Sequence, residues 1–194
     1  MMIRLATRED VPAILEIYAP YVENTAISFE YSVPSLEEFT ARFQRITARF
    51  PWLVWEENGQ ILGYAYGSLP WERAAYGWCA EVSIYLHPAA HRKGIGSALY
   101  SVLEQLLQLQ GYLKVYAVIT TANQASVDFH EAAGYRLTAS FPDCGFKHGT
   151  WHGTLWLEKQ LSSVEMPTSV PIPLEGIVDF DRKFREILDT LSLS

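Results

Sequence analysis

The run of residues 80–99 constrains the fold more than any other part of the chain. It reads as a strand over 81–86, a turn opened by a proline, a glycine pair at Gly94 and Gly96, and an amphipathic helix that Gly111 ends. Glycines at a strand-to-helix turn let an anion approach the backbone, where free N–H groups and the positive end of the helix dipole face it. The run therefore predicts a phosphate-binding turn.

The residues around the glycines narrow the class of anion site. Arg92 and Lys93 place two cations beside the turn. The P-loop of nucleotide triphosphatases is excluded, because no Lys-Ser or Lys-Thr follows the second glycine. A Rossmann dinucleotide site fits poorly, because a third glycine is missing and the preceding chain is not an opening β-α-β unit.

Charge and cysteine content limit the function further. The chain has 194 residues and a net charge of −7, so we expect no broad nucleic-acid-binding surface, although a local cationic pocket stays compatible. Cys79 and Cys144 are too few for a disulfide framework or a zinc set, and we expect no metal site. The charged first residues contain no apolar run long enough for a signal peptide or a membrane span, which predicts a cytoplasmic protein with no membrane partner.

The composition along the chain predicts three parts. Residues 1–161 read as one domain, and 162–176 read as a proline-rich linker. Residues 177–194 predict an amphipathic helix with a single apolar stripe. Such a stripe should be buried, either on its own domain or on a second subunit, and the sequence leaves both open.

Periodicity and turn signals predict the elements of the domain. We expect strands over residues 3–6, 52–57, 60–67, 81–86, 114–119, 135–140 and 154–158. Ser35 and Glu38 form a capping box at a helix start, and Asn58-Gly59 is typical of a two-residue hairpin. The buried strand after the glycine-turn helix predicts a right-handed parallel crossover. These signals predict an α/β (α+β) fold with a mixed sheet and helices on both faces.

Four motifs, in the same order, resemble those of the GNAT N-acetyltransferases, and more narrowly their phosphinothricin and methionine sulfoximine acetyltransferase branch. The motifs are residues 81–96, residues 117–119 with Asn123, residues 130–135, and residues 145–151. The resemblance implies the GNAT fold, with a mostly antiparallel sheet and a parallel crossover at the cofactor site. It also implies an enzyme that transfers acetyl directly from acetyl-CoA to an amine.

Acetyl transfer needs an amine that has lost its proton and a proton for the leaving thiolate. The resemblance implies that Glu81 is the base, acting through a water, and that His130 protonates the thiolate. A solvated strand carboxylate and a satisfied structural histidine are the competing interpretations of these two residues.

The resemblance places acetyl-CoA on the strand end, the glycine turn and a following helix. The expected contacts are Ile84, Tyr85, Leu86, His91, Arg92, Lys93, Gly94, Ile95, Gly96, Ser97, Asn123 and Ser126. The strand segment 84–86 would act through its main chain, and Asn123 also fits a simple helix cap. His91 replaces the Arg or Gln that opens the family's phosphate motif, which removes one side-chain contact but keeps the main-chain N–H groups.

The acceptor would lie on the other side of the catalytic strand. The expected contacts are Phe29, Trp71, Arg73, Tyr76, Lys147 and His148. Arg73 can form a bidentate pair with an amino-acid carboxylate, although a surface arginine fits equally. Phe29 also fits ordinary core, and the Lys147-His148 pair also fits a role in fixing a loop. Trp71 and Gly153 depart from the family, which often has arginine and aspartate there.

The resemblance implies a homodimer that acetylates the α-amine of a small, amino-acid-like acceptor, such as phosphinothricin, methionine sulfoximine or a related amino acid. Two alternatives stay open. One is acetylation of a protein N-terminus or another amine. The other is a catalytically degenerate acetyl-CoA-binding module, which the departures at His91 and Gly153 motivate.

Overall fold

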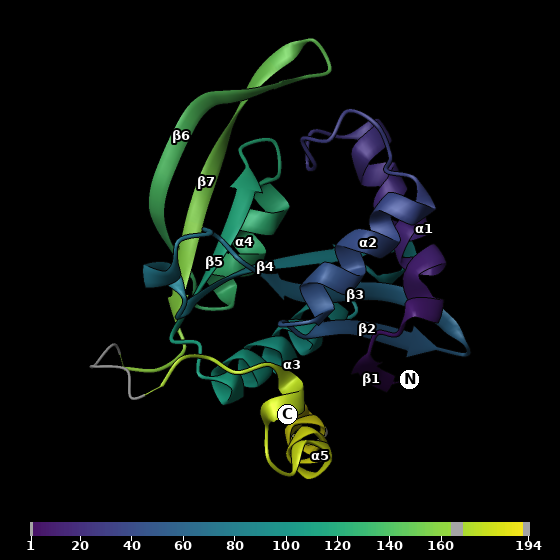
Figure 1. Cartoon of the computed structure of the whole chain (residues 1–194). Helices are drawn as coiled ribbons and strands as arrows, with labels where there is room; N and C mark the ends of the chain where they lie inside the picture. The colour runs from purple at the N-terminus through teal and green to yellow at the C-terminus, as the bar shows by residue number, and fades with distance from the viewer. Residues whose placement is uncertain (1, 164–168, 192–194) are drawn as a thin grey trace.

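A computed structural model describes residues 2–163 and 169–191, and there seven strands form one sheet in the order β1-β2-β3-β4-β5-β7-β6 (Figure 1). The strands are β1 (Met2–Leu5), β2 (Trp52–Glu57), β3 (Gln60–Ser68), β4 (Cys79–Leu86), β5 (Lys114–Thr120), β6 (Arg136–Lys147) and β7 (Thr150–Gln160). β4 and β5 pair in parallel, and the other neighbours pair antiparallel. The expected mixed, mostly antiparallel sheet with a parallel crossover is confirmed.

Helices cover both faces of the sheet, as expected. They are α1 (Val11–Asn24), α2 (Leu36–Thr47), α3 (Ile95–Gln110), α4 (Gln124–Ala132) and α5 (Phe180–Leu191). Apolar residues of α1 and α2 pack with Trp52 and Tyr64 in one buried cluster. Apolar residues of α3 pack with Leu53, Val82 and Val115 in a second cluster on the opposite face. The sheet therefore lies between two apolar layers.

The local signals read from the sequence are present. The backbone N–H of Glu38 donates to Ser35 Oγ at 3.2 Å, and the N–H of Ser35 donates to Glu38 Oε2 at 2.8 Å. Asn58 and Gly59 both have positive φ, 52° and 76°, as a type I′ hairpin turn requires. These contacts confirm the capping box and the hairpin.

The last two strands are longer than the expected 135–140 and 154–158. β6 and β7 continue to the turn between Lys147 and Thr150, and their register shifts between Phe141 and Gly145. Pro142 interrupts the sequence pattern, but β6 is the edge strand, where a proline can be accommodated because one side of the strand has no partner. The hairpin therefore rises beyond the rest of the sheet (Figure 1).

The C-terminal stripe packs on the chain's own domain. Partly buried residues of α5, including Phe184 and Leu188, contact the core cluster that contains α3. Before α5, the N–H of Ile172 donates to the Gln110 carbonyl at 2.9 Å, and the Gln110 side chain donates to the Ile172 carbonyl at 2.8 Å. Parts of the expected linker and helix, residues 164–168 and 192–194, lie outside the described residues. No helix in the described ranges has both the length and the apolar character needed to cross a bilayer.

Candidate active site

A slot opens where β4 and β5 separate. In the described chain their parallel register spans only Cys79–Glu81 and Lys114–Tyr116. Two adjoining cavities, of about 60 Å³ and about 480 Å³, lie beyond this point. Both are lined by Ile27, Ile84, Asn123 and Ser126. We call these two cavities the interstrand slot.

The glycine turn forms the outer end of the slot. Gly94 has a φ of 77°, and a Cβ built on it meets no atom within 4 Å, so a ligand can come close to the backbone. The Ala98 N–H donates to the Gly94 carbonyl at 3.0 Å as the first helical bond of α3. The N–H groups of residues 95–97 precede that bond and are available at the positive end of the helix dipole. This geometry fits a pyrophosphate.

Most of the expected cofactor contacts meet in the slot. Residues 84–86, His91, Arg92, residues 94–97, Asn123 and Ser126 line one or both cavities, whereas Lys93 lines neither. The Asn123 side chain also accepts from the Ser126 N–H at 3.2 Å, so it caps α4 as well. His91 is exposed, and its Nε2 lies 3.5 Å from the Tyr21 hydroxyl.

Glu81 stands at the point where β4 and β5 part. Its neighbours Ala80 and Val82 belong to the core under α3, so strand alternation directs Glu81 to the opposite face. The side chain is half-buried, and in the described residues its carboxylate has no hydrogen bond or ion pair. Burial raises the pKa of Glu81 to about 7, because the charged form loses hydration without gaining a partner. A carboxylate with this pKa can accept a proton near neutral pH.

His130 is buried, with 2% of its surface exposed, and both ring nitrogens have partners. Nδ1 lies 2.7 Å from the Ser126 carbonyl, which can only accept, so Nδ1 carries the proton. Nε2 therefore accepts from the Tyr100 hydroxyl at 2.9 Å. Burial lowers the pKa of His130, which favours this neutral form. Tyr100 and His130 line the smaller cavity together.

An aromatic cluster lies beside Glu81, in the region where the acceptor is expected. Tyr116, the β5 partner of Glu81, contacts the ring of Trp71 with centroids 5.1 Å apart. Trp71 also stacks on Trp156 at 5.4 Å and contacts Tyr76 at 4.8 Å. The structure thus brings Trp71 and Tyr76 close to the proposed base. Arg73 is exposed, and no ion pair or side-chain hydrogen bond is found for it in the described residues.

Lys147 and His148 hold the loop between α1 and α2. Lys147 is 3% exposed, and its ammonium donates to the Val22 and Ser28 carbonyls at 2.7 and 2.6 Å. His148 Nε2 lies 3.2 Å from the Thr25 carbonyl. These contacts occupy both side chains and favour the loop-fixing role that the sequence left open. Acceptor contact by either residue stays a prediction.

Phe29 packs on β6 but keeps 36% of its surface exposed, and the backbone around Gly153 is closely packed. A Cβ on Gly145 would lie 2.3 Å from the Phe29 ring, so the α1–α2 loop rests directly on β6. A Cβ on Gly153 would lie 2.8 Å from the Phe141 carbonyl oxygen and 3.1 Å from Thr121. An aspartate has no room at position 153 of this backbone.

The acetyltransferase (GNAT) domain family matches residues 3–156 of the chain. The chain belongs to this family. It is 38% identical to a phosphinothricin N-acetyltransferase of Streptomyces viridochromogenes, over 77% of this chain and 82% of that protein. An L-amino acid N-acyltransferase of Escherichia coli is 34% identical, over 88% of this chain and 99% of that protein.

A solved structure shares the fold. The phosphinothricin acetyltransferase of Sinorhizobium meliloti, crystallised in complex with AcCoA, superposes with a TM-score of 0.83 at 36% identity, over 92% of this chain and 96% of that chain. As a GNAT enzyme, this chain is an acetyltransferase with acetyl-CoA as its cosubstrate. The slot fits that molecule, since it combines a narrow gap between strands with an anion-binding turn at its outer end.

Several residues of this GNAT slot were not predicted from the sequence, among them Tyr21, Ile27 and Tyr100. Ile27 and Tyr21 reach the larger cavity from α1 and the loop after it, and the Tyr21 hydroxyl donates to the Leu86 carbonyl at 2.6 Å. Tyr100 lies on α3, where a buried aromatic at helical spacing reads as ordinary core. No sequence signal separates these positions from packing residues.

Proposed function

We propose that this GNAT enzyme acetylates the α-amine of a small, amino-acid-like acceptor, such as phosphinothricin, methionine sulfoximine or a related amino acid. The observation that carries the proposal is Glu81, a half-buried carboxylate with a pKa of about 7 where the slot meets the acceptor side. The names of the relatives from Streptomyces viridochromogenes and Escherichia coli support an amino-acid-like acceptor.

In this proposal the cosubstrate supplies an activated acetyl group, and the chain positions the groups around it. Glu81 accepts a proton from the acceptor ammonium, directly or through a water, so that the free amine can attack. The main chain of 84–86, which has no β5 partner, holds the cosubstrate's arm and its thioester oxygen. In the smaller cavity the Tyr100 hydroxyl gives its proton to the leaving thiolate, and His130, whose Nε2 accepts from that hydroxyl before the reaction, holds it in place.

The test is release of free thiol from acetyl-CoA in the presence of single acceptors. The panel contains phosphinothricin, methionine sulfoximine, methionine sulfone, the natural amino acids and peptides with free N-termini. Release with a free amino acid or its analogue, and not with peptides, supports the proposal. Release with peptides alone indicates a macromolecular acceptor. Silence across the panel with intact coenzyme binding indicates a binding module.

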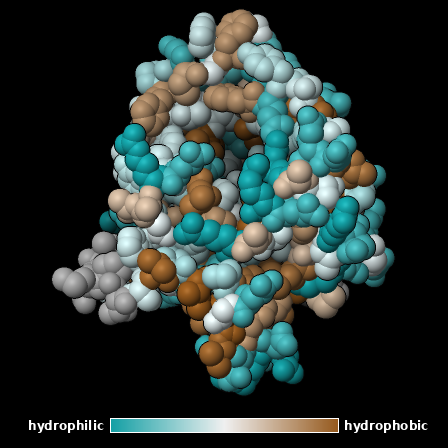
Figure 2. All heavy atoms as spheres, in the orientation of Figure 1, coloured by the Kyte–Doolittle hydropathy of each residue, from teal (hydrophilic) through white to brown (hydrophobic). Residues whose placement is uncertain are grey.

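We also propose that the enzyme works as a homodimer through the β6–β7 hairpin. Phe141, Phe146 and Trp151 are 50%, 46% and 59% exposed there, an unusual concentration of apolar surface on one hairpin. Figure 2 shows hydrophobic atoms along the upper part of the molecule, where β6 and β7 lie. A second copy of the chain is the partner that this surface would take.

For localisation, we propose the cytoplasm. Cys79 and Cys144 are both free thiols, as is usual in a reducing compartment. Fractionation of cells that produce the protein tests this, and recovery outside the cytoplasmic fraction would contradict it.

A further inference from the structure

The loop between α1 and α2 supplies one wall of the interstrand slot. Ile27 of this loop lines both cavities of the slot, and so does Ile84 of β4. In the proposed function the main chain at Ile84 holds the thioester, so Ile27 lies beside the reacting end of acetyl-CoA. The Ile27 side chain is partly buried and carries no polar group. What such a side chain can do at this place is exclude water.

The backbone around Ile27 is held on both sides. The N–H of Ile27 donates to Thr25 Oγ1 at 3.0 Å, and that hydroxyl donates to the Tyr21 carbonyl at 2.6 Å. On the other side, Ser28 is 6% exposed, and its Oγ lies 2.7 Å from the Tyr18 hydroxyl. These contacts tie both flanks of Ile27 to α1.

The β6–β7 hairpin fixes the same segment through Lys147. The Lys147 ammonium donates to the carbonyls of Val22 and Ser28, which precede and follow Ile27, at 2.7 and 2.6 Å. Burying an ammonium is costly unless hydrogen bonds replace its water. The two carbonyls replace that water only while the loop stays in this position. The burial of Lys147 and the position of Ile27 therefore depend on each other.

Water is a competing nucleophile at this site. Glu81, with a pKa of about 7, can accept a proton from water as it does from an amine. The water oxygen would then attack the thioester carbon, the carbon–sulfur bond would break, and the thiolate would take the Tyr100 proton, which gives acetate and free coenzyme A. Each such event consumes an acetyl group without acetylating an amine, and closing a site against water prevents this side reaction.

We infer that Ile27 closes the slot against water at the thioester, and that Lys147 is the positioning residue that holds Ile27 there. The inference rests on acetyl-CoA as cosubstrate and on the proposed placement of its thioester beside Ile84. It does not depend on which amine is acetylated. It gives the buried ammonium of Lys147, which takes no part in the proposed proton transfers, a role in the reaction.

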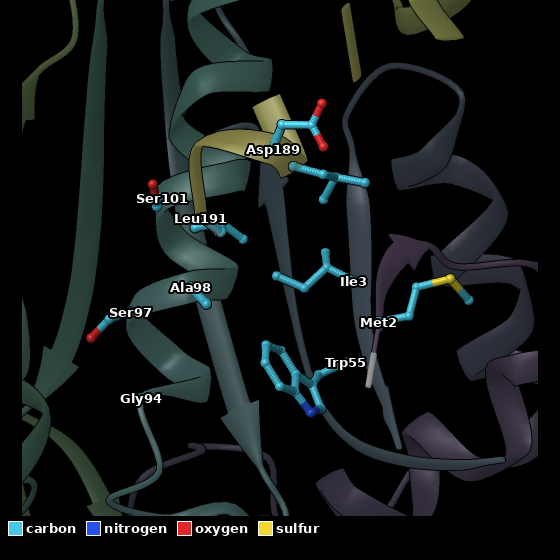
Figure 3. Close-up of a pocket in the computed structure, with 10 residues that line it drawn as sticks. Met2, Ile3, Trp55, Gly94, Ser97, Ala98, Ser101, Asp189 and Leu191 are labelled. Carbon is cyan, nitrogen blue, oxygen red and sulfur yellow. The ribbon is translucent and has the colours of Figure 1, made fainter. Parts of the chain in front are cut away.

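A cavity lined by neither Ile27 nor Ile84 supplies the matched control. It has a volume of about 620 Å³ and lies between β1, β2, the first turns of α3 and the C-terminal helix α5 (Figure 3). Leu188 of α5 lines this cavity and is partly buried, as Ile27 is in the slot. Leu188→Ala therefore removes as much apolar side chain as Ile27→Ala does, but away from the thioester.

The experiment measures the release of coenzyme A and acetate from saturating acetyl-CoA by the full chain, with no acceptor present. We expect Ile27→Ala to raise this hydrolysis at least about tenfold, a change of about 1.4 kcal/mol in the barrier. Ile27→Leu restores the side-chain volume and should lower the rate at least about fivefold from that of Ile27→Ala. Leu188→Ala should match the wild type.

Two further variants test the positioning role. Lys147→Met, with Ile27 intact, should raise the hydrolysis several-fold, because the loop loses its charged donor. His148→Asn should give a smaller rise, because the shorter side chain loses the contact of His148 Nε2 with the Thr25 carbonyl. Position 148 is exposed and has a φ of 50°, which asparagine tolerates, so this variant replaces Lys147→Met if the latter does not fold.

Three results overturn the inference. Wild-type hydrolysis in Ile27→Ala removes the role of Ile27. An equal rise in Leu188→Ala would indicate a general loosening of the fold instead of an opened slot. A rise in Ile27→Ala with none in Lys147→Met and His148→Asn removes the positioning role. Because no acceptor is present, a wrong acceptor assignment leaves these rates unaffected and would appear only in the acceptor panel.

Discussion

At the scale of single residues, Glu81 depends on its neighbours for its chemistry. Ala80 and Val82 are buried under α3, and this fixes the carboxylate on the other face without a partner. The sequence motif identified Glu81, but its raised pKa follows from burial by elements distant in sequence. Tyr100 shows the opposite case, because its hydroxyl becomes relevant only through His130, which lies on another helix.

Glu81→Gln separates catalysis from stability. We expect turnover to fall about 10²-fold or more, because the amide cannot accept the proton. Burial raises the pKa of Glu81 in the folded protein above its value in the unfolded chain. Protonated Glu81 therefore stabilises the fold at a pH below the unfolded pKa, and this contribution to the free energy of unfolding is lost as the pH rises through about 7. At pH 8 the variant should therefore unfold at a higher urea concentration than the wild type.

The control for this variant is Glu131→Gln, an exposed carboxylate on α4. It should match the wild type in both turnover and urea midpoint. Near-wild-type turnover of Glu81→Gln would remove Glu81 from the mechanism.

The pH profile provides an independent test of the same residue. The rate at low acceptor concentration should rise with pH and level off above about 7, as Glu81 loses its proton. Steady-state kinetics from pH 5 to 9, corrected for the fraction of acceptor that is protonated, give the profile. A rate that is flat between pH 5 and 8 after this correction contradicts the assignment.

At the scale of elements, the regular parts were predictable and the hairpin was not. The capping box at Ser35 and the turn at Asn58-Gly59 depend on local geometry, which a few residues determine. The length of β6 and β7 depends on the α1–α2 loop, which packs against them through Phe29 and Lys147. Such long-range support has no periodic signal in the sequence.

Lys147→Met tests this support. It leaves the Val22 and Ser28 carbonyls without their charged donor, and we expect a loss of roughly 2–4 kcal/mol in unfolding free energy, on the scale of charged hydrogen bonds. Denaturant titration measures the loss. Lys183→Met on α5, which lacks such contacts to a buried loop, should change stability by less than about 0.5 kcal/mol. Equal stability of the two variants would show that the hydrogen bonds of Lys147 contribute nothing to the free energy of unfolding.

At the scale of the whole molecule, the sequence left two surfaces undecided. The α5 stripe had two possible partners, and its docking on α3 depends on how the chain returns through Ile172 and Gln110. The exposed hairpin aromatics, for which we propose a second subunit, cannot be told from core residues by pattern, because both are apolar and alternate along a strand.

Light scattering tests the proposed dimer. The wild type should have twice the 22.0 kDa mass of one chain, and a variant with Phe146→Ser and Trp151→Ser should have the mass of a monomer. Val178→Ser, which changes a residue that is 75% exposed outside the hairpin, should stay dimeric. A monomeric wild type, or a dimeric double variant, would reject the hairpin interface.

The slot also predicts a large response of stability to coenzyme. Binding at about 100 times the dissociation constant adds about 2.7 kcal/mol, which corresponds to a rise of roughly 5–10 °C in Tm for a domain of this size. A thermal unfolding series in coenzyme A measures the rise. A rise in Tm below about 1 °C under these conditions would contradict binding of coenzyme A in the interstrand slot.

The short parallel register between β4 and β5 has a consequence for the life of the protein in a cell. Within the described ranges the ladder between β4 and β5 covers only residues 79–81 and 114–116, so at this seam we expect the two strands to separate more readily than the other strand pairs of the sheet. Proteases act on such opened states, and a ligand that bridges the seam keeps it closed. The half-life of the enzyme should therefore lengthen when acetyl-CoA is abundant and shorten during carbon starvation, which would match its amount to the supply of its own cosubstrate without any change in gene expression.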